Sequence, residues 1–204
     1  MQPSYYITKT GVNHVIASST PAADDISRLL LLHFLKQINY GPVSFSDILK
    51  YFNNDKSLTF KKISSMISYQ LIDMSESNLH STENTISQSS STISHYCSDN
   101  DYVLADLNGL AISSCGFNQI QASNISAIAY DYIKASKRSR YEIESHEIES
   151  PLSIRTSWNN LDIIIYVLYI NKFSCLLITK NEDFINKNEF IHLASHLCNR
   201  YNYE

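Results

Sequence analysis

The chain has 204 residues, of which 44% are apolar and 18% charged, so it can bury a hydrophobic core and is not a disordered polymer. Its formal net charge is −4, so the chain lacks the large excess of basic residues that is typical of nucleic-acid-binding proteins. It contains only four glycines and no glycine-rich phosphate-binding sequence, which excludes a nucleotide-binding P-loop.

The cysteines and the N-terminus indicate the compartment. The four cysteines are scattered, with no CxxC pair, and the opening sequence MQPSYYITKT lacks the basic and apolar segments of a secretory signal. The longest apolar run, residues 161–170, is too short to span a membrane and contains Asp162. We therefore expect a cytoplasmic protein with free thiols and no membrane association.

The front of the chain predicts an extended lead followed by a helix. The lead covers residues 1–20, with short extended pieces expected at 5–7 and 12–16. Thr20-Pro21 predicts the start of a helix, which continues with apolar residues at helical spacing to Ile38.

Two further helices complete this region. Ser44, with Asp47 three residues on, predicts the capping box of a short helix, and a third helix is expected over 58–71. We assign residues 21–74 to one helical unit. Residues 75–98 are rich in Ser and Thr and poor in apolar residues, so we assign them to a linker.

Over residues 99–204 the spacing of the apolar residues differs from that of the helical unit, which predicts a second domain. Asn108-Gly109 between two short apolar strands is a strong hairpin signal, and a helix with several small residues is expected over 121–135. Three strands and a closing helix are expected over 152–158, 161–170, 173–179 and 183–201. This order predicts an α+β domain with a five-stranded antiparallel sheet flanked by helices.

The segment DYVLADLNGLAISSCGFNQIQASNISAIAYDYIKAS resembles the core of the roadblock / dynein light chain family. It has an apolar strand ending in Asp106, a turn with Gly109, a return strand, a loop with Gly116 and an Ala-rich helix. The later strands and the closing helix follow in the family's order. The resemblance covers about residues 100–200 and implies a roadblock- or profilin-like sheet.

The resemblance also implies a function. Members of the family dimerise and act as non-catalytic regulators or scaffolds, so we expect a homodimer, no catalytic residues and no cofactor. A small Ras-like GTPase is the leading further partner. Small residues let two helix backbones approach closely, and an edge strand offers unpaired backbone groups. We therefore expect the dimer or partner interface at Ala122, Ser126, Ala129, Ile133, Ile154 and Trp158.

Two histidines four residues apart, His192 and His196, have the spacing of a helical metal pair. Neither a glutamate base nor a distant third ligand accompanies them. We read them as part of the polar face of the closing helix and expect no metal.

The helical unit resembles, more loosely, a winged-helix or helix-turn-helix unit through the string VSFSDILKYFNNDKSLTFKKISSMISYQL. A dimeric DNA-binding transcriptional regulator is therefore an alternative function, with nucleic-acid contacts at Lys56, Lys61, Lys62 and Ser65. A solvated polar face on an ordinary helix explains the same residues. A small-molecule sensor is a third alternative, which an enclosed apolar pocket would favour.

Overall fold

The computed structural model describes residues 3–17, 25–38, 41–75, 101–139, 153–158, 161–170, 173–180 and 184–201. Over these residues the chain is α+β, with one three-stranded and one five-stranded sheet. The fold class predicted from the sequence is confirmed.

The larger sheet is antiparallel throughout, in the order β5-β4-β8-β7-β6. Its strands are β4 (Tyr102–Asp106), β5 (Ala111–Cys115), β6 (Ser153–Trp158), β7 (Leu161–Ile170) and β8 (Phe173–Thr179). Strands β7 and β8 are nearly continuous apolar runs because helices cover both faces of the sheet.

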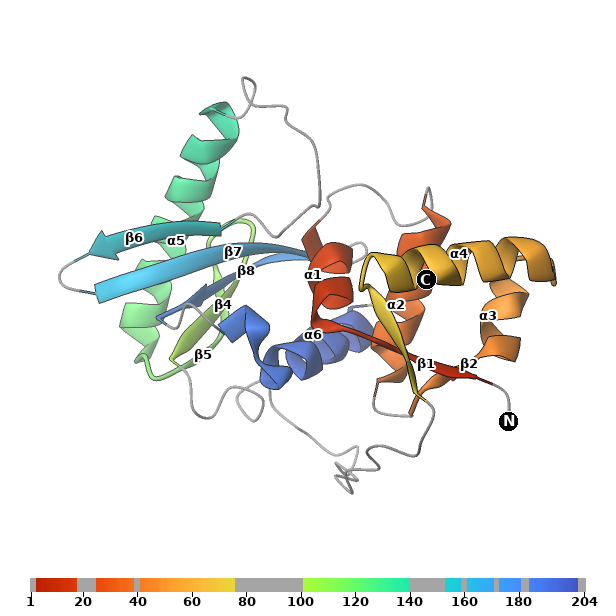
Figure 1. Ribbon diagram of the computed structural model, residues 1–204. Helices are drawn as coiled ribbons and strands as arrows, with labels where there is room; N and C mark the ends of the chain where they lie inside the picture. The colour runs from red at the N-terminus through yellow and green to blue at the C-terminus, as the bar shows by residue number, and fades with distance from the viewer. Residues whose placement is uncertain are drawn as a thin grey trace.

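The two faces of this sheet are covered by helices from different parts of the chain. Helix α5 (Gln119–Ser139) packs on the face that carries Val103 and Ala105. Helices α1 (Lys9–Ala17) and α6 (Asn188–Arg200) pack on the face that carries Tyr102 and Leu104 (Figure 1). Successive strand residues point to opposite faces, so the alternation of side chains along β4 serves both cores.

Helix α1 corrects one expectation. The prediction of an extended piece at 12–16 is wrong, because these residues lie inside a helix. Val12, Val15 and Ile16 are fully buried, and their spacing of three and four places them on one helical face against the sheet. A short apolar run such as this is compatible with the residue spacing of a strand and with that of a helix, and packing against the sheet selects the helix.

The smaller sheet has the order β2-β1-β3, so its central strand comes from the N-terminus. Strand β1 (Ser4–Ile7) pairs antiparallel with β2 (Val43–Ser44) on one side and with β3 (Ile72–Ser75) on the other. Together with α2 (Ile26–Gln37), α3 (Phe45–Tyr51) and α4 (Lys56–Ser68), these strands form what we call the small-sheet unit.

The caps of its helices explain where they begin. Asp25, Ser44 and Asp55 each accept a hydrogen bond from a backbone N–H in the first turn of the following helix. The predicted cap at Ser44 is confirmed, since its hydroxyl accepts from the N–H of Asp47 at 3.2 Å. Residues 18–24, which hold the predicted Thr20-Pro21 start, lie outside the described residues.

One hydrophobic core joins the small-sheet unit to the large sheet. Buried residues of β1, α1, α2 and α4 share a single cluster with those of β4, β7, β8 and α6. Polar contacts cross the same boundary: Arg28 Nε donates to the carbonyl of Val15 at 3.0 Å, and Asn199 Nδ2 to that of Lys36 at 3.5 Å. Figure 1 shows α1 and α6 lying between the two sheets. Of the predicted linker, only residue 75 is among the described residues.

Candidate protein interface

The β4–β5 hairpin precedes α5 in the chain and packs against it. Asp106 Oδ1 accepts from the backbone N–H groups of Asn108 at 2.9 Å and Leu110 at 2.8 Å, and the N–H of Gly109 donates to the Asp106 carbonyl at 3.1 Å. Partial burial pushes the pKa of Asp106 upward, but these N–H donors hold it below its ordinary value. The carboxylate therefore organises the turn.

The tip of the hairpin leans directly on α5. Gly109 has a φ of +81°, and a Cβ at this position would lie 2.9 Å from Cβ of Tyr130. Glycine is thus required both by the backbone angle and by the close approach of the helix.

The inward face of α5 carries the predicted interface residues. Ala122, Ser126, Ala129 and Ile133 are at most 3% exposed and pack on the large sheet. The hydroxyl of Ser126 donates to the carbonyl of Ala122 at 2.7 Å. This corrects the expectation that these residues face a second helix: their small side chains let α5 approach its own sheet.

The outward face of α5 is the part that a partner can reach. Ile120, Asn124, Ala127 and Asp131 recur at helical spacing and are exposed, with Ile120 at 75%. Periodicity finds both stripes in the sequence, but it does not say which one the sheet covers. A single exposed isoleucine such as Ile120 is ordinary on a protein surface, so exposure and spacing alone define this stripe.

Strand β6 adjoins this helix at the edge of the large sheet. The hydroxyl of Thr156 donates to that of Tyr132 on α5 at 3.0 Å, and Ile154 packs partly buried against the core under α5. Trp158 pairs through its backbone with Leu161 where β6 meets β7. Within the part of the chain that the structure describes, only β7 pairs with β6, so its other side carries unpaired backbone groups.

The Thr156–Tyr132 hydrogen bond joins these two elements. We call them together the α5–β6 surface and define it by Ile120, Asn124, Ala127, Asp131 and Tyr132 of α5 together with strand β6. It includes a helix face and a strand edge, and each is suited to contact with another polypeptide.

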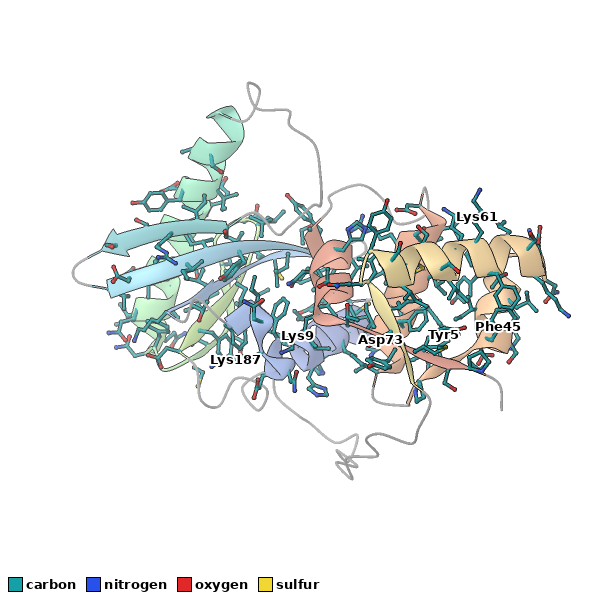
Figure 2. The ribbon with its side chains drawn as sticks, in the orientation of Figure 1. Tyr5, Lys9, Phe45, Lys61, Asp73 and Lys187 are labelled. Atoms are coloured by element: carbon teal, nitrogen blue, oxygen red, sulfur yellow. The ribbon has the colours of Figure 1, made fainter. Side chains whose placement is uncertain are left out.

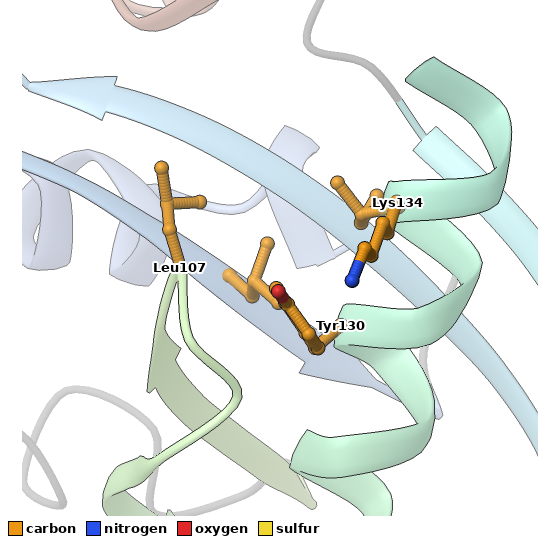
Figure 3. A pocket seen from close by; sticks show the side chains of 5 residues that line it. Leu107, Tyr130 and Lys134 are labelled. Carbon is orange, nitrogen blue, oxygen red and sulfur yellow. The ribbon is translucent and has the colours of Figure 1, made fainter. Parts of the chain in front are cut away.

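A small hollow lies on the other flank of α5. It has a volume of about 200 Å³ and is lined by Leu107, Tyr130, Ile133, Lys134 and Leu176 (Figure 3). The Lys134 ammonium lies 5.6 Å from the centre of the Tyr130 ring. The volume is below the roughly 300 Å³ at which small-molecule sites begin, so the hollow does not favour the sensor alternative.

The four predicted nucleic-acid contacts do not share one face of α4. Lys56 and Lys61 are exposed, whereas Lys62 and Ser65 are half-buried along the side of the helix. Strand β3, which follows this helix, pairs with the N-terminal β1.

Burial shifts the pKa values of three ionisable side chains on α6 toward their neutral forms. Burial lowers the pKa of His192 and of His196, and both lie on α6. Burial raises the pKa of the Cys198 thiol to about 11, so it stays protonated near neutral pH. Among the residues placed in the structure, no three His, Cys, Asp or Glu side chains gather as a metal group.

No helix in the described ranges is both long enough and apolar enough to cross a membrane.

Comparison with known proteins gives a distant structural likeness. No protein-family model matches the chain, and no curated protein matches it. A solved structure that does match is the Roadblock/LC7 domain from Streptomyces avermitilis, with 13% identity, a TM-score of 0.39, and coverage of 52% of this chain and 92% of that domain. A likeness at this level concerns the fold alone.

Proposed function

We propose that this protein is a non-catalytic scaffold or regulator that pairs with a second copy of itself through the α5–β6 surface. The observation that carries the proposal is the exposed edge of β6 beside the outward face of α5, joined to it by the Thr156–Tyr132 hydrogen bond. The resemblance of residues 100–200 to the roadblock / dynein light chain family supports the same assignment.

A second copy fits this surface for reasons of symmetry. An antiparallel strand can pair with its own copy about a two-fold axis, which satisfies the free N–H and C=O groups of both edges. The same axis brings the outward faces of two α5 helices together, where Ala127 and Asn124 are small enough to allow contact. Pairing would therefore extend the large sheet beyond β6.

The dimer is tested by changing one exposed alanine on each edge of the domain. Ala127→Arg places a charge on the outward face of α5, and Ala111→Arg places the same charge on the opposite edge strand β5. We expect light scattering to give a dimer mass for the native chain and for Ala111→Arg, and a monomer mass for Ala127→Arg. A monomeric native chain, or dissociation by Ala111→Arg alone, would refute the proposal.

We also propose that the paired domain binds a small Ras-like GTPase. The support is the family resemblance together with the absence of a P-loop from the chain itself, so that any nucleotide would be bound by the partner. A direct test measures binding of a small GTPase from the same genome, loaded with GDP or with a non-hydrolysable GTP analogue. We expect one nucleotide state to bind more tightly. Equal absence of binding in both states would reject the GTPase while leaving the dimer intact.

A further inference from the structure

The tip of the β4–β5 hairpin carries the Asn-Gly pair of this chain, Asn108-Gly109. An asparagine followed by glycine is the pair most open to loss of its side-chain amide, because glycine has no Cβ to hinder attack by its own backbone nitrogen. Asn108 is exposed to solvent, whereas Gly109 is buried. The reactive amide is therefore wet, and its attacking nitrogen lies inside the fold.

The reaction needs only water and occurs within the chain. The backbone nitrogen of Gly109 gives up its proton to solvent and bonds to Cγ of Asn108. The bond between Cγ and Nδ2 then breaks, and the amide nitrogen takes a proton from solvent and leaves as ammonia. Water opens the resulting cyclic imide at either carbonyl, so position 108 becomes aspartate or isoaspartate. The net change is the hydrolysis of an amide to a carboxylate and ammonia.

The folded turn opposes this attack through Asp106. The N–H of Gly109 donates to the carbonyl of Asp106 at 3.1 Å, which favours retention of its proton. Asn108 Nδ2 donates to Asp106 Oδ2 at 3.3 Å, which holds the leaving group in place. The nearby carboxylate also disfavours the negative charge that the Gly109 nitrogen must acquire before it attacks.

Helix α5 keeps the turn in this arrangement. A Cβ on Gly109 would lie 2.9 Å from Cβ of Tyr130 and 3.2 Å from the carbonyl oxygen of Ser126, so the tip has no room to swing toward the helix. Figure 3 shows the loop that carries Leu107 beside Tyr130. The backbone rotation that brings the Gly109 nitrogen to Cγ of Asn108 therefore requires the tip to move away from α5.

The products do not restore the native turn. An aspartate at position 108 places a second carboxylate where the Asn108 amide now donates to Asp106, so attraction becomes repulsion. An isoaspartate directs the main chain through the side chain and adds a methylene between Asp106 and Leu110. The N–H of Leu110, which now donates to Asp106 Oδ1 at 2.8 Å, is then out of register.

We propose that Asn108 is a site of spontaneous deamidation that the closed hairpin protects, so that the modification permanently marks chains whose hairpin has opened. When opening and closing are fast, the rate of such a reaction follows the population of the open form. The proposal goes beyond the dimer and the GTPase proposed above and depends on neither. A monomeric native chain would refute the dimer and leave this inference unchanged.

The test measures conversion at position 108 by peptide mapping and mass spectrometry during incubation of the full chain at mildly alkaline pH. Asp106→Ala removes the hydrogen bonds that hold the turn. Asp73→Ala is the matched control: it makes the same change on β3 in the small sheet, where Asp73 accepts from the hydroxyl of Tyr6 at 3.1 Å (Figure 2).

We expect the native chain to deamidate at least about 10-fold more slowly than the chain unfolded in urea. Asp106→Ala should speed the reaction of the folded chain roughly 10-fold, and Asp73→Ala should change it by no more than about 2-fold. A measurement on the native chain needs no variant. Urea below the unfolding transition should raise the deamidation rate in parallel with hydrogen exchange of the Gly109 amide.

Four results would overturn the proposal. The first is equal deamidation of the folded and the unfolded chain, and the second is no conversion at Asn108 in either. The third is equal acceleration by Asp106→Ala and Asp73→Ala, which would mean that only global unfolding exposes the site. The fourth is a deamidation rate that does not follow exchange of the Gly109 amide.

Discussion

At the scale of single residues, Gly109 shows most clearly how one position serves two constraints. Its φ of +81° is a left-handed angle, and its Cα faces the side of α5 at Tyr130. Gly41 offers a comparison within the same chain. It also has a positive φ, of +107°, but a Cβ there would meet nothing within 4 Å.

We expect Gly41→Ala to lower the free energy of unfolding by about 1–2 kcal/mol, from backbone strain alone. Gly109→Ala should cost about 1–3 kcal/mol more, because its Cβ also overpacks against Tyr130. Urea denaturation followed by circular dichroism measures both. Equal losses would show that α5 moves aside freely and that the hairpin does not position it.

The hairpin itself is predictable from the sequence because its signals are local. Asn108-Gly109 specifies the turn, and Asp106 lies two residues before Asn108, where its carboxylate can accept from the turn N–H groups. All of these groups lie within five consecutive residues, so no distant part of the chain needs to be known.

At the scale of elements, α5 shows that the spacing of residues reveals which of them share a helix face but not which face is buried. The spacing of Ala122, Ser126 and Ala129 correctly places them on one face. It does not reveal that the chain's own sheet covers that face, because small residues favour a close approach to any neighbour. The strand order fixes that β7 and β8 are central, but only the three-dimensional packing decides which side of α5 meets them.

A pair of alanines on α5 tests this assignment. Ala129→Leu inserts a larger side chain at a fully buried position, and we expect it to lower the free energy of unfolding by about 1–3 kcal/mol. Ala127→Leu makes the same change on the exposed stripe, and we expect a change within about 0.5 kcal/mol. Thermal and urea unfolding of the two variants give the comparison. A larger loss for Ala127→Leu would mean that the inward and outward faces have been exchanged.

The partners of helix α1 and strand β1 could not be predicted from the sequence, for a different reason. The pairs Tyr5↔Met74 and Ile7↔Ile72 join residues far apart in the sequence. No local pattern marks such a partner, so the first residues read as a lead rather than as the centre of a sheet. The closing helix is nearer to its prediction, although it is divided into a short 3-10 turn, Phe184–Asn186, and α6.

At the scale of the whole molecule, the two sheets are bound by a shared core and by the first helix. Strand β1 lies in the small sheet, while α1, which follows it after Thr8, packs on the large sheet. Any change that loosens β1 is therefore expected to loosen both sheets.

We expect Ile7→Ala to lower the free energy of unfolding by about 2–4 kcal/mol, since Ile7 is 5% exposed in the joined core. Tyr6→Ala is the neighbouring control on the outer face, where Tyr6 is 43% exposed. Native-state hydrogen exchange is the measurement. Protection should fall equally for the amides of β3 and β8 in Ile7→Ala, because both open in one global transition. Loss confined to β3 would show two independently unfolding parts.

The packing of α1 on the large sheet also has a consequence for folding during translation. Residues 9–17 leave the ribosome well before their partner strand β7, residues 161–170. At about 5–20 residues per second, the wait is on the order of ten seconds or more. During that time Val12, Val15 and Ile16 have no sheet to cover them. Such a high contact order slows folding and leaves apolar groups open to chaperones. Until β7 has been synthesised, the apolar face of α1 therefore has no large sheet on which to pack.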